Sequence, residues 1–199
     1  MNLIPVFPTA VAKFELGRDF TAEELAFVNS QPTFKNMGNT TSDDTYVLAQ
    51  EAMADLKAFI EASVAKYLLG IHDPKEGVSL RLTQSWLNYT KPGEYHHKHE
   101  HPNSFVSGVL YINANRESDK IYFYKNVYQQ IILPVKNYNA FNSISWWIPV
   151  NSGELILFPS SLTHMVETVE GSDTRISLSF NTFPIGNIGE DKSLTALHV

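Results

Sequence analysis

From residue 78 onward the chain is a succession of short apolar or alternating segments, separated by glycine, proline and asparagine. Runs of about four to eight such residues between turn-forming residues are typical of β-strands, and many of them in succession indicate a sandwich or a barrel. We expect strands at Ser79–Thr90, Phe105–Asn113, Lys120–Lys125, Gln130–Pro134, Ile144–Val150, Glu154–Phe158, Met165–Val169 and Thr174–Phe183. The pattern therefore predicts a mainly β chain.

Residues 1–77 predict a strand and two helices that brace this β core. A strand is expected at Val6–Leu16, and Thr21-Ala22-Glu23-Glu24 is typical of a capping box that opens a short helix. The polar stretch Ser30–Thr45 is expected to be a loop. From about Thr45 to Leu69 apolar residues recur at every third or fourth position. This periodicity predicts a long helix packed on a sheet, and Gly70 is expected to end it.

Nothing in the sequence marks a linker, an internal repeat or a low-complexity segment. We therefore expect residues 1–199 to form a single domain. Its parts would be an N-terminal strand and helices over 1–77, a β core over 78–184 and a C-terminal tail over 185–199.

Composition narrows the chemistry that the chain can use. It contains no cysteine, which excludes disulfides, thiolate zinc sites and cysteine nucleophiles, so any metal must be held by His, Asp or Glu. The net charge of −6 argues against an extended surface for nucleic acids or anionic membranes. The N-terminus has no basic and apolar signal segment, and no apolar run approaches the roughly 20 residues that span a bilayer. A soluble cytoplasmic protein is expected.

Four of the seven histidines lie in the segment Tyr95–Pro102. Because side chains alternate in an extended chain, three of them are expected on one face, where they could share a metal: His97, His99 and His101. A polar surface loop that happens to be rich in histidine is the alternative. The cluster has well-defined flanks: Gly93 precedes it, Pro102 ends it and the apolar run Val106–Ile112 follows directly. A solvated loop does not need such flanks, so they favour a metal site.

Two later residues extend this candidate site. His164 follows an apolar strand that Pro159 ends, and it is the only mid-chain candidate for a third ligand. Arg175 opens a perfectly alternating segment, whose polar face consists of Arg175, Ser177, Ser179 and Asn181. A buried arginine is unfavourable without a partner, and a dicarboxylate ligand would pair with it bidentately. An ordinary ion pair or a surface arginine is the alternative.

Together these stretches resemble the Fe(II)/2-oxoglutarate-dependent oxygenase superfamily, and most closely its small family found in bacteria and in phages of marine cyanobacteria. The resembling residues run in family order from 85 to 181, about half of the chain. They are Ser85-Trp86-Leu87-Asn88-Tyr89, Gly93-Glu94-Tyr95, His99-Glu100-His101-Pro102, Ser107-Gly108-Val109-Leu110-Tyr111, Gly153-Glu154-Leu155-Ile156-Leu157-Phe158-Pro159, His164, Arg175-Ile176-Ser177 and Asn181. No single piece is decisive, but the ordered set is specific.

The resemblance implies a double-stranded β-helix, the jelly-roll barrel that cupins share. It also implies a dioxygenase that uses Fe(II), 2-oxoglutarate and O2, a hydroxylase that couples oxidative decarboxylation of 2-oxoglutarate to oxidation of a substrate. By position, the metal ligands and catalytic residues would be His99, His101 and His164. Arg175 and Ser177 match residues that bind the 5-carboxylate of 2-oxoglutarate, and Tyr89 and Asn88 match secondary co-substrate contacts.

One position departs from the superfamily pattern. The middle ligand is usually a carboxylate, and this chain has His101 there. An all-histidine site adds no negative charge, so a bound iron keeps its full charge and its reduction potential should rise. Glu100 points to the opposite face of an extended strand and is a poor substitute. The register with His97 and His99 as the ligand pair stays open, although the spacing from Gly93 favours His99 and His101.

Two other functions fit parts of this pattern. A metal-binding cupin that does not use 2-oxoglutarate (an isomerase, another dioxygenase or a ligand-binding module) accounts for Gly93 followed by His99-x-His101. However, residues 102–107 lack the glutamate of the cupin motif, and a cupin has no use for Arg175 on the inner face. A non-catalytic barrel with a degenerate site is the other alternative, but this chain retains every histidine the site needs.

The substrate cannot be inferred from the sequence. Residues 114–148 are expected to form one wall of the pocket, and a protein side chain, a nucleobase or a small metabolite would all be compatible with them. The sequence also leaves the oligomeric state open, and the frequent dimers of the superfamily make a homodimer one candidate assembly.

Overall fold

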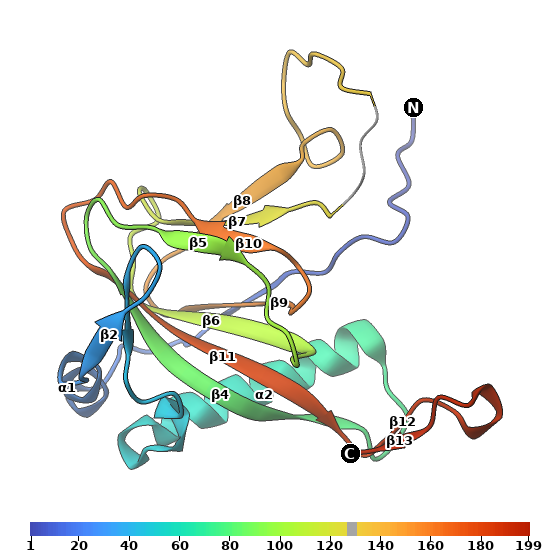
Figure 1. The fold of residues 1–199 in the computed structure, drawn as a ribbon, viewed down its shortest axis with the longest axis horizontal. Helices are drawn as coiled ribbons and strands as arrows, with labels where there is room; N and C mark the ends of the chain where they lie inside the picture. Colours follow the sequence, from blue (N-terminus) through green and yellow to red (C-terminus); the bar gives the residue numbers. More distant parts are fainter. Residues whose placement is uncertain (127–130) are drawn as a thin grey trace.

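Two antiparallel β-sheets face each other across the centre of the molecule (Figure 1). The computed structural model describes residues 1–126 and 131–199. The larger sheet is 7-stranded with the order β1-β9-β6-β11-β4-β3-β2, and the smaller is 4-stranded with the order β5-β10-β7-β8. The strands are β1 Ala12–Glu15, β2 Thr33–Lys35, β3 Thr40–Ser42, β4 Ser79–Thr90, β5 His96–His99, β6 Val106–Asn113, β7 Lys120–Tyr124, β8 Ser145–Pro149, β9 Glu154–Pro159, β10 His164–Val166, β11 Arg175–Ile185, β12 Asn187–Ile188 and β13 Leu197–His198.

The strands β9-β6-β11-β4 lie opposite the 4-stranded sheet, which is the arrangement of a jelly roll (Figure 1). Seven of the expected strands are confirmed to within a few residues, and β4 has the expected bounds. The expected strand Gln130–Pro134 begins outside the described residues, and residues 131–134 form no strand.

Alternation along the central strands directs side chains to two separate apolar clusters. On β6, Leu110 and Ile112 pack with the helices on the outer face of the large sheet, whereas Val109 and Tyr111 pack between the two sheets. Gly108 lies at a tightly packed point on the outer face of the large sheet, since a Cβ there would lie 2.2 Å from Cζ of Phe180. The space between the sheets is therefore partly filled with side chains, which leaves room for a small cavity.

The helix α2, Ala54–His72, crosses the outer face of the large sheet (Figure 1). Two 3-10 turns, Val47–Ala49 and Glu51–Met53, precede it, so the α-helix begins later than the sequence predicted. The prediction that Gly70 ends the helix was wrong. The helix runs on to His72, whose ring centroid lies 5.0 Å from that of Phe105, and a glycine inside a helix costs only roughly 1 kcal/mol.

The stretch Ser30–Thr45 was predicted to be a loop, and the structure corrects this to a hairpin. β2 and β3 pair with each other, and β3 pairs with β4 through Thr40↔Tyr89 and Thr41↔Asn88. The segment has few apolar residues because it lies at the edge of the sheet, where backbone hydrogen bonds define the strand. Polar side chains at a sheet edge give little periodic signal.

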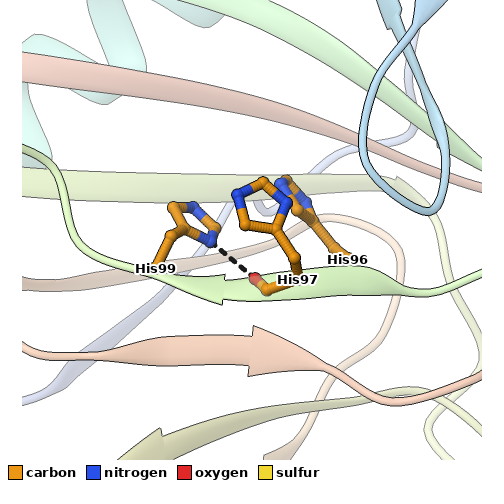
Figure 2. A group of neighbouring side chains, drawn as sticks. All are labelled: His96, His97 and His99. Atoms are coloured by element: carbon orange, nitrogen blue, oxygen red, sulfur yellow. Dashed lines mark hydrogen bonds between the residues drawn. The ribbon is translucent and has the colours of Figure 1, made fainter.

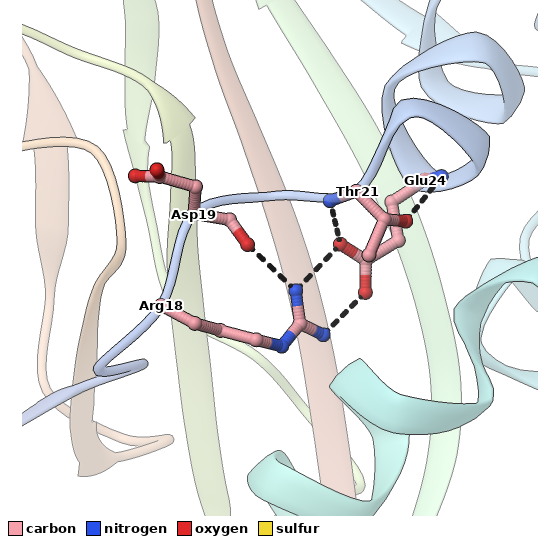
Figure 3. Close-up of polar contacts among 4 residues, drawn as sticks. All are labelled: Arg18, Asp19, Thr21 and Glu24. Atoms are coloured by element: carbon pink, nitrogen blue, oxygen red, sulfur yellow. Dashed lines mark hydrogen bonds and ion pairs between the residues drawn. The ribbon is translucent and has the colours of Figure 1, made fainter.

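The first helix, α1 at Ala22–Asn29, begins with the capping box that the sequence predicted (Figure 3). The N–H of Glu24 donates to Oγ1 of Thr21, and the N–H of Thr21 donates to Oε2 of Glu24 at 2.8 Å. Arg18 adds two hydrogen bonds to the same carboxylate, at 2.9 and 2.6 Å. Burial alone would raise the pKa of Glu24, but these bonds hold it below its usual value.

The remaining elements are short. A 3-10 turn at Asp191–Ser193 joins β12 to β13, and this pair forms a separate hairpin at one end of the barrel (Figure 1). Within residues 1–126 and 131–199, no helix is both long enough and apolar enough to cross a membrane.

Candidate metal centre

The principal site residues predicted from the sequence meet in a cavity between the two sheets. Its walls come from β4, β5, β6, β7, β10 and β11, together with the loop after β5. The lining residues are Trp86, His96, His99, His101, Val109, Tyr111, Ile121, His164, Met165, Val166, Arg175, Ser177 and Ser179. Several imidazoles therefore share one cavity with a guanidinium and with hydroxyl groups of β11.

Strand pairing brings three histidines together although they are distant in sequence. His164, at the start of β10, is the direct partner of His99 on β5. The Nε2 atoms of His101 and His164 lie 3.2 Å apart. The nitrogens that the three rings can offer to a metal all lie within 4.8 Å of one another. The group that includes His164 thus contains His99 and His101, the preferred register, and does not contain His97.

Backbone carbonyls orient two of these rings. Nδ1 of His99 is 2.7 Å from the carbonyl oxygen of His97, and Nδ1 of His164 is 2.9 Å from that of Leu162. A carbonyl can only accept, so the proton is on Nδ1 and the lone pair is on Nε2. This arrangement is typical of metal-binding histidines, whose second nitrogen donates to a fixed acceptor.

The cavity keeps these rings neutral. Burial, together with the neighbouring imidazoles, lowers the pKa of His101 to about 4 and that of His164 to about 3, although the hydrogen bond to Leu162 acts in the opposite direction on His164. Burial also lowers the pKa of His99. Neutral imidazole is the form that coordinates a metal, so the site is prepared for a cation without first losing protons.

Arg175 lines the same cavity and is buried, with 3% of its surface exposed. Its Nε and Nη1 atoms have no hydrogen-bond partner among the described residues. Burial lowers its pKa, whereas the nearby Tyr111 and Asp119 act in the opposite direction. Arginine stays charged even so. A buried cation with unpaired donors is unfavourable, and a carboxylate ligand would relieve it.

The predicted alternation of polar and apolar side chains along β11 places Arg175 on the cavity side of the strand. Arg175, Ser177 and Ser179 line the cavity, while Leu178 and Phe180 pack in the cluster beneath the helices. A strand with one polar and one apolar face was therefore correctly assigned, with the polar face toward the cavity.

A fourth histidine, His96, lines the cavity although simple alternation would turn it away from His99. The cause is an irregularity in β5: His99 is opposite His164, but His96 is opposite Val166, so three steps on β5 match two on β10. A β-bulge of this kind turns an extra side chain to the same face. Figure 2 shows His96, His97 and His99 on the same side of the strand.

Two residues expected to contact the co-substrate lie elsewhere. The hydroxyl of Tyr89 donates to the carbonyl oxygen of Val28 at 2.5 Å, on the face that packs against the helices. Asn88 is on the cavity side of β4, but its amide nitrogen donates to Ser179 at 3.0 Å and its oxygen accepts from Thr41. Neither lines the cavity. Alternation on β4 explains the position of Tyr89, which lies next to the inward positions.

Among the lining residues with aromatic rings, three were not expected site residues: Trp86, Tyr111 and His96. Trp86, two positions before Asn88 on β4, has its ring centroid 5.7 Å from that of His101. Tyr111 is almost fully buried on the inward face of β6. Alternation along β4 and β6 could have indicated both, because each lies on the inward face of its strand. His96 had no such signal.

A family model described as "Putative 2OG-Fe(II) oxygenase" matches residues 84–181, about half of the chain. The match covers the whole histidine cluster, His164 and Arg175. The chain belongs to the 2OG-Fe(II) oxygenase family. The oxygenase therefore uses Fe(II), 2-oxoglutarate and O2, and the cupin alternative without 2-oxoglutarate is disfavoured. No curated protein matches the oxygenase in sequence.

Several solved structures have a similar fold. HygX from Streptomyces hygroscopicus, with nickel, 2-oxoglutarate and hygromycin B bound, has a TM-score of 0.59 and 13% identity, over 88% of this chain and 83% of that one. A prolyl hydroxylase from Trichoplax adhaerens, in complex with a hypoxia inducible factor peptide, has a TM-score of 0.61 and 13% identity, over 87% and 83%. A 2OG-Fe(II) oxygenase family oxidoreductase from Burkholderia pseudomallei has a TM-score of 0.59 and 12% identity, over 81% and 76%. These similarities confirm the double-stranded β-helix.

Proposed function

We propose that the oxygenase holds Fe(II) with His99, His101 and His164 and binds 2-oxoglutarate with Arg175 and Ser177. The observation that supports this assignment is the presence of a neutral histidine cluster and an unpaired buried guanidinium in one cavity. The unpaired guanidinium is unfavourable without a partner. A cation fits the histidine cluster and a carboxylate fits the guanidinium, and 2-oxoglutarate carries a carboxylate at each end.

The donor set fits iron. Imidazole nitrogens are suitable ligands for Fe(II), and the fixed Nδ1 protons of His99 and His164 direct Nε2 toward the shared space. Nε2 of His101 lies 3.2 Å from Nε2 of His164, so the two nitrogens are close enough to bind one cation between them. We therefore infer that the cluster is built for one metal ion.

The rest of the cavity fits a dicarboxylate. Arg175 supplies a planar fork of donors, and Ser177 lies on the same face of β11 with its hydroxyl toward the cavity. The apolar residues Val109 and Ile121 line the same cavity and make part of its wall apolar. An apolar wall strengthens the pairing of the guanidinium with a carboxylate.

Each residue then has a role in the reaction. The three histidines hold the metal with neutral nitrogens, Arg175 and Ser177 orient the co-substrate, and the apolar part of the wall lowers the local polarity around them. When bound, iron with 2-oxoglutarate and O2 supplies oxidative decarboxylation to succinate and CO2, coupled to oxidation of the organic substrate. The protein contributes position and a partly apolar environment. The candidate homodimer and the expected cytoplasmic location stay predictions.

The test is anaerobic reconstitution with Fe(II), followed by titration with 2-oxoglutarate while the visible charge-transfer absorption of the chelate is recorded. Wild type should develop the band. Arg175→Ala should bind iron normally but lose the band at moderate co-substrate concentration, since the distal carboxylate loses its partner. His164→Ala should not bind iron. Arg81→Ala is the matched control, because Arg81 lies on β4 and packs over Phe183, away from the cavity.

Two results would contradict the proposal. A normal band in Arg175→Ala would remove that residue from the co-substrate site. Iron binding by wild type without a response to any 2-oxo acid would instead favour a metal-binding barrel of another function.

A further inference from the structure

The β-bulge in β5 gives the cavity a histidine that the proposed function does not yet use. His96 lines the cavity together with His99 and Arg175. Its ring stacks on that of His99, with centroids 4.7 Å apart and an interplanar angle of 19°. No hydrogen bond joins its ring nitrogens to any described residue, so both are available to a ligand in the cavity.

The pairing of β5 with β10 indicates toward which end of the cavity the ring of His96 lies. Its partner on β10 is Val166, whereas the partner of His99 is the metal-site residue His164. Val166 also lines a second hollow, whose wall includes Arg175. The rings that His96 contacts are those of His97 and His99, and among the described residues none belongs to His101 or His164. His96 therefore lies on the side of His99 that faces Arg175.

We propose that His96 donates a ring N–H to the distal carboxylate of 2-oxoglutarate, alongside Arg175. This inference rests on the proposed function and adds a specificity-determining residue to it. A carboxylate has two oxygens and about four acceptor positions, so it can accept from the guanidinium and from an imidazole together. The two donors come from different sheets, β11 and β5, and together they would select for an acid with a second carboxylate at the right distance.

The neighbouring histidine supplies a matched control. His97 is also on β5, but it does not line the cavity, and its Nδ1 lies 3.4 Å from the carbonyl oxygen of Met37. His99 bonds to the backbone oxygen of His97 and not to its side chain, so His97→Leu leaves that bond in place. His96→Leu and His97→Leu thus make the same chemical change at a residue that lines the cavity and at one that does not.

The experiment measures binding by calorimetry with the chain loaded with Ni(II), which occupies the site without turnover. Two acids are compared: 2-oxoglutarate and 2-oxopentanoate, in which a methyl group replaces the distal carboxylate. For His96→Leu we expect 2-oxoglutarate to bind roughly 10- to 100-fold more weakly, the range for a lost hydrogen bond to a charged group. Binding of 2-oxopentanoate should change by less than about threefold. His97→Leu should match wild type for both acids, and His96→Gln, which keeps an N–H donor, should recover part of the loss.

Other outcomes would overturn the inference. Equal weakening for both acids would mean that His96 acts at the metal end or only through packing. Weaker Ni(II) binding in both His96→Leu and His97→Leu would instead assign them, with His99, to a second metal position, since their nitrogens also lie within 4.8 Å of one another. If wild type binds 2-oxoglutarate and His96→Leu binds it equally well, only this inference fails. If wild type binds none, the proposed function fails.

Discussion

At the scale of single residues, the metal site depends on which nitrogen of each imidazole carries the proton. Carbonyl oxygens of His97 and Leu162 set that choice for His99 and His164. The sequence predicted these histidines as metal ligands from spacing and resemblance. It could not indicate their tautomers, because the accepting carbonyls are placed by the path of the backbone.

The all-histidine ligand set has a measurable electrostatic consequence. In His101→Asp a carboxylate replaces an imidazole, and its negative charge stabilises Fe(III) more than Fe(II). The reduction potential of the iron-loaded chain should therefore fall, as measured by redox titration. His97→Asp is the control, because it adds the same charge outside the group that contains His164. Equal shifts in the two variants would mean that position 101 does not bind the metal.

Local regularity decided which residues were predictable. Arg175 and Ser177 were assigned to one inner face because β11 follows simple alternation. His96 was not assigned, because the bulge that turns it inward arises from the pairing of β5 with β10. Nothing in Tyr95–Pro102 itself marks where that extra residue falls.

At the scale of elements, the capping box of α1 was predictable because all of its contacts lie within four residues of chain. The pairing with Arg18 adds a pH dependence. In the folded state the pKa of Glu24 is lowered, so its carboxylate contributes stability above its unfolded pKa and loses it as pH falls through the folded value.

Glu24→Gln should therefore lower the unfolding free energy by roughly 1–3 kcal/mol at neutral pH. The difference from wild type should shrink below about pH 4, where the wild-type carboxyl is protonated as well. Urea unfolding at several pH values measures this. Glu61→Gln is the control, since the Lys57–Glu61 pair is exposed and 4.0 Å apart and should contribute less than about 0.5 kcal/mol. A difference that does not depend on pH would contradict the ion-pair explanation.

Other elements were mispredicted for a common reason. The hairpin of β2 and β3 and the extension of α2 past Gly70 both depend on neighbours distant in sequence. An edge strand of polar residues and a glycine inside a helix each give a misleading local signal, and in both cases packing or pairing with the large sheet determines the outcome.

At the scale of the whole molecule, the contact between the large sheet and its neighbours leaves no room at Gly108. Gly108→Ala should destabilise the fold by about 1–3 kcal/mol, because the new Cβ would meet the buried ring of Phe180 and the side chain of Leu157. Gly70→Ala is the matched control: its Cβ would have no neighbour within 4 Å, and it should stabilise α2 by roughly 0.5–1 kcal/mol. Denaturant midpoints of the two variants should move in opposite directions. A midpoint for Gly108→Ala at or above that of wild type would contradict this packing.

The sequence by itself determined the strand pattern of the barrel, the capping of α1, the polar face of β11 and the residue types that could hold a metal and a carboxylate. These follow from period, spacing and chemistry within short stretches. Only the tertiary structure decided that His99, His101 and His164 meet, that Tyr89 turns away and that His96 turns inward. Such placements depend on the register between strands far apart in the chain, where one extra residue moves a side chain from one face to the other.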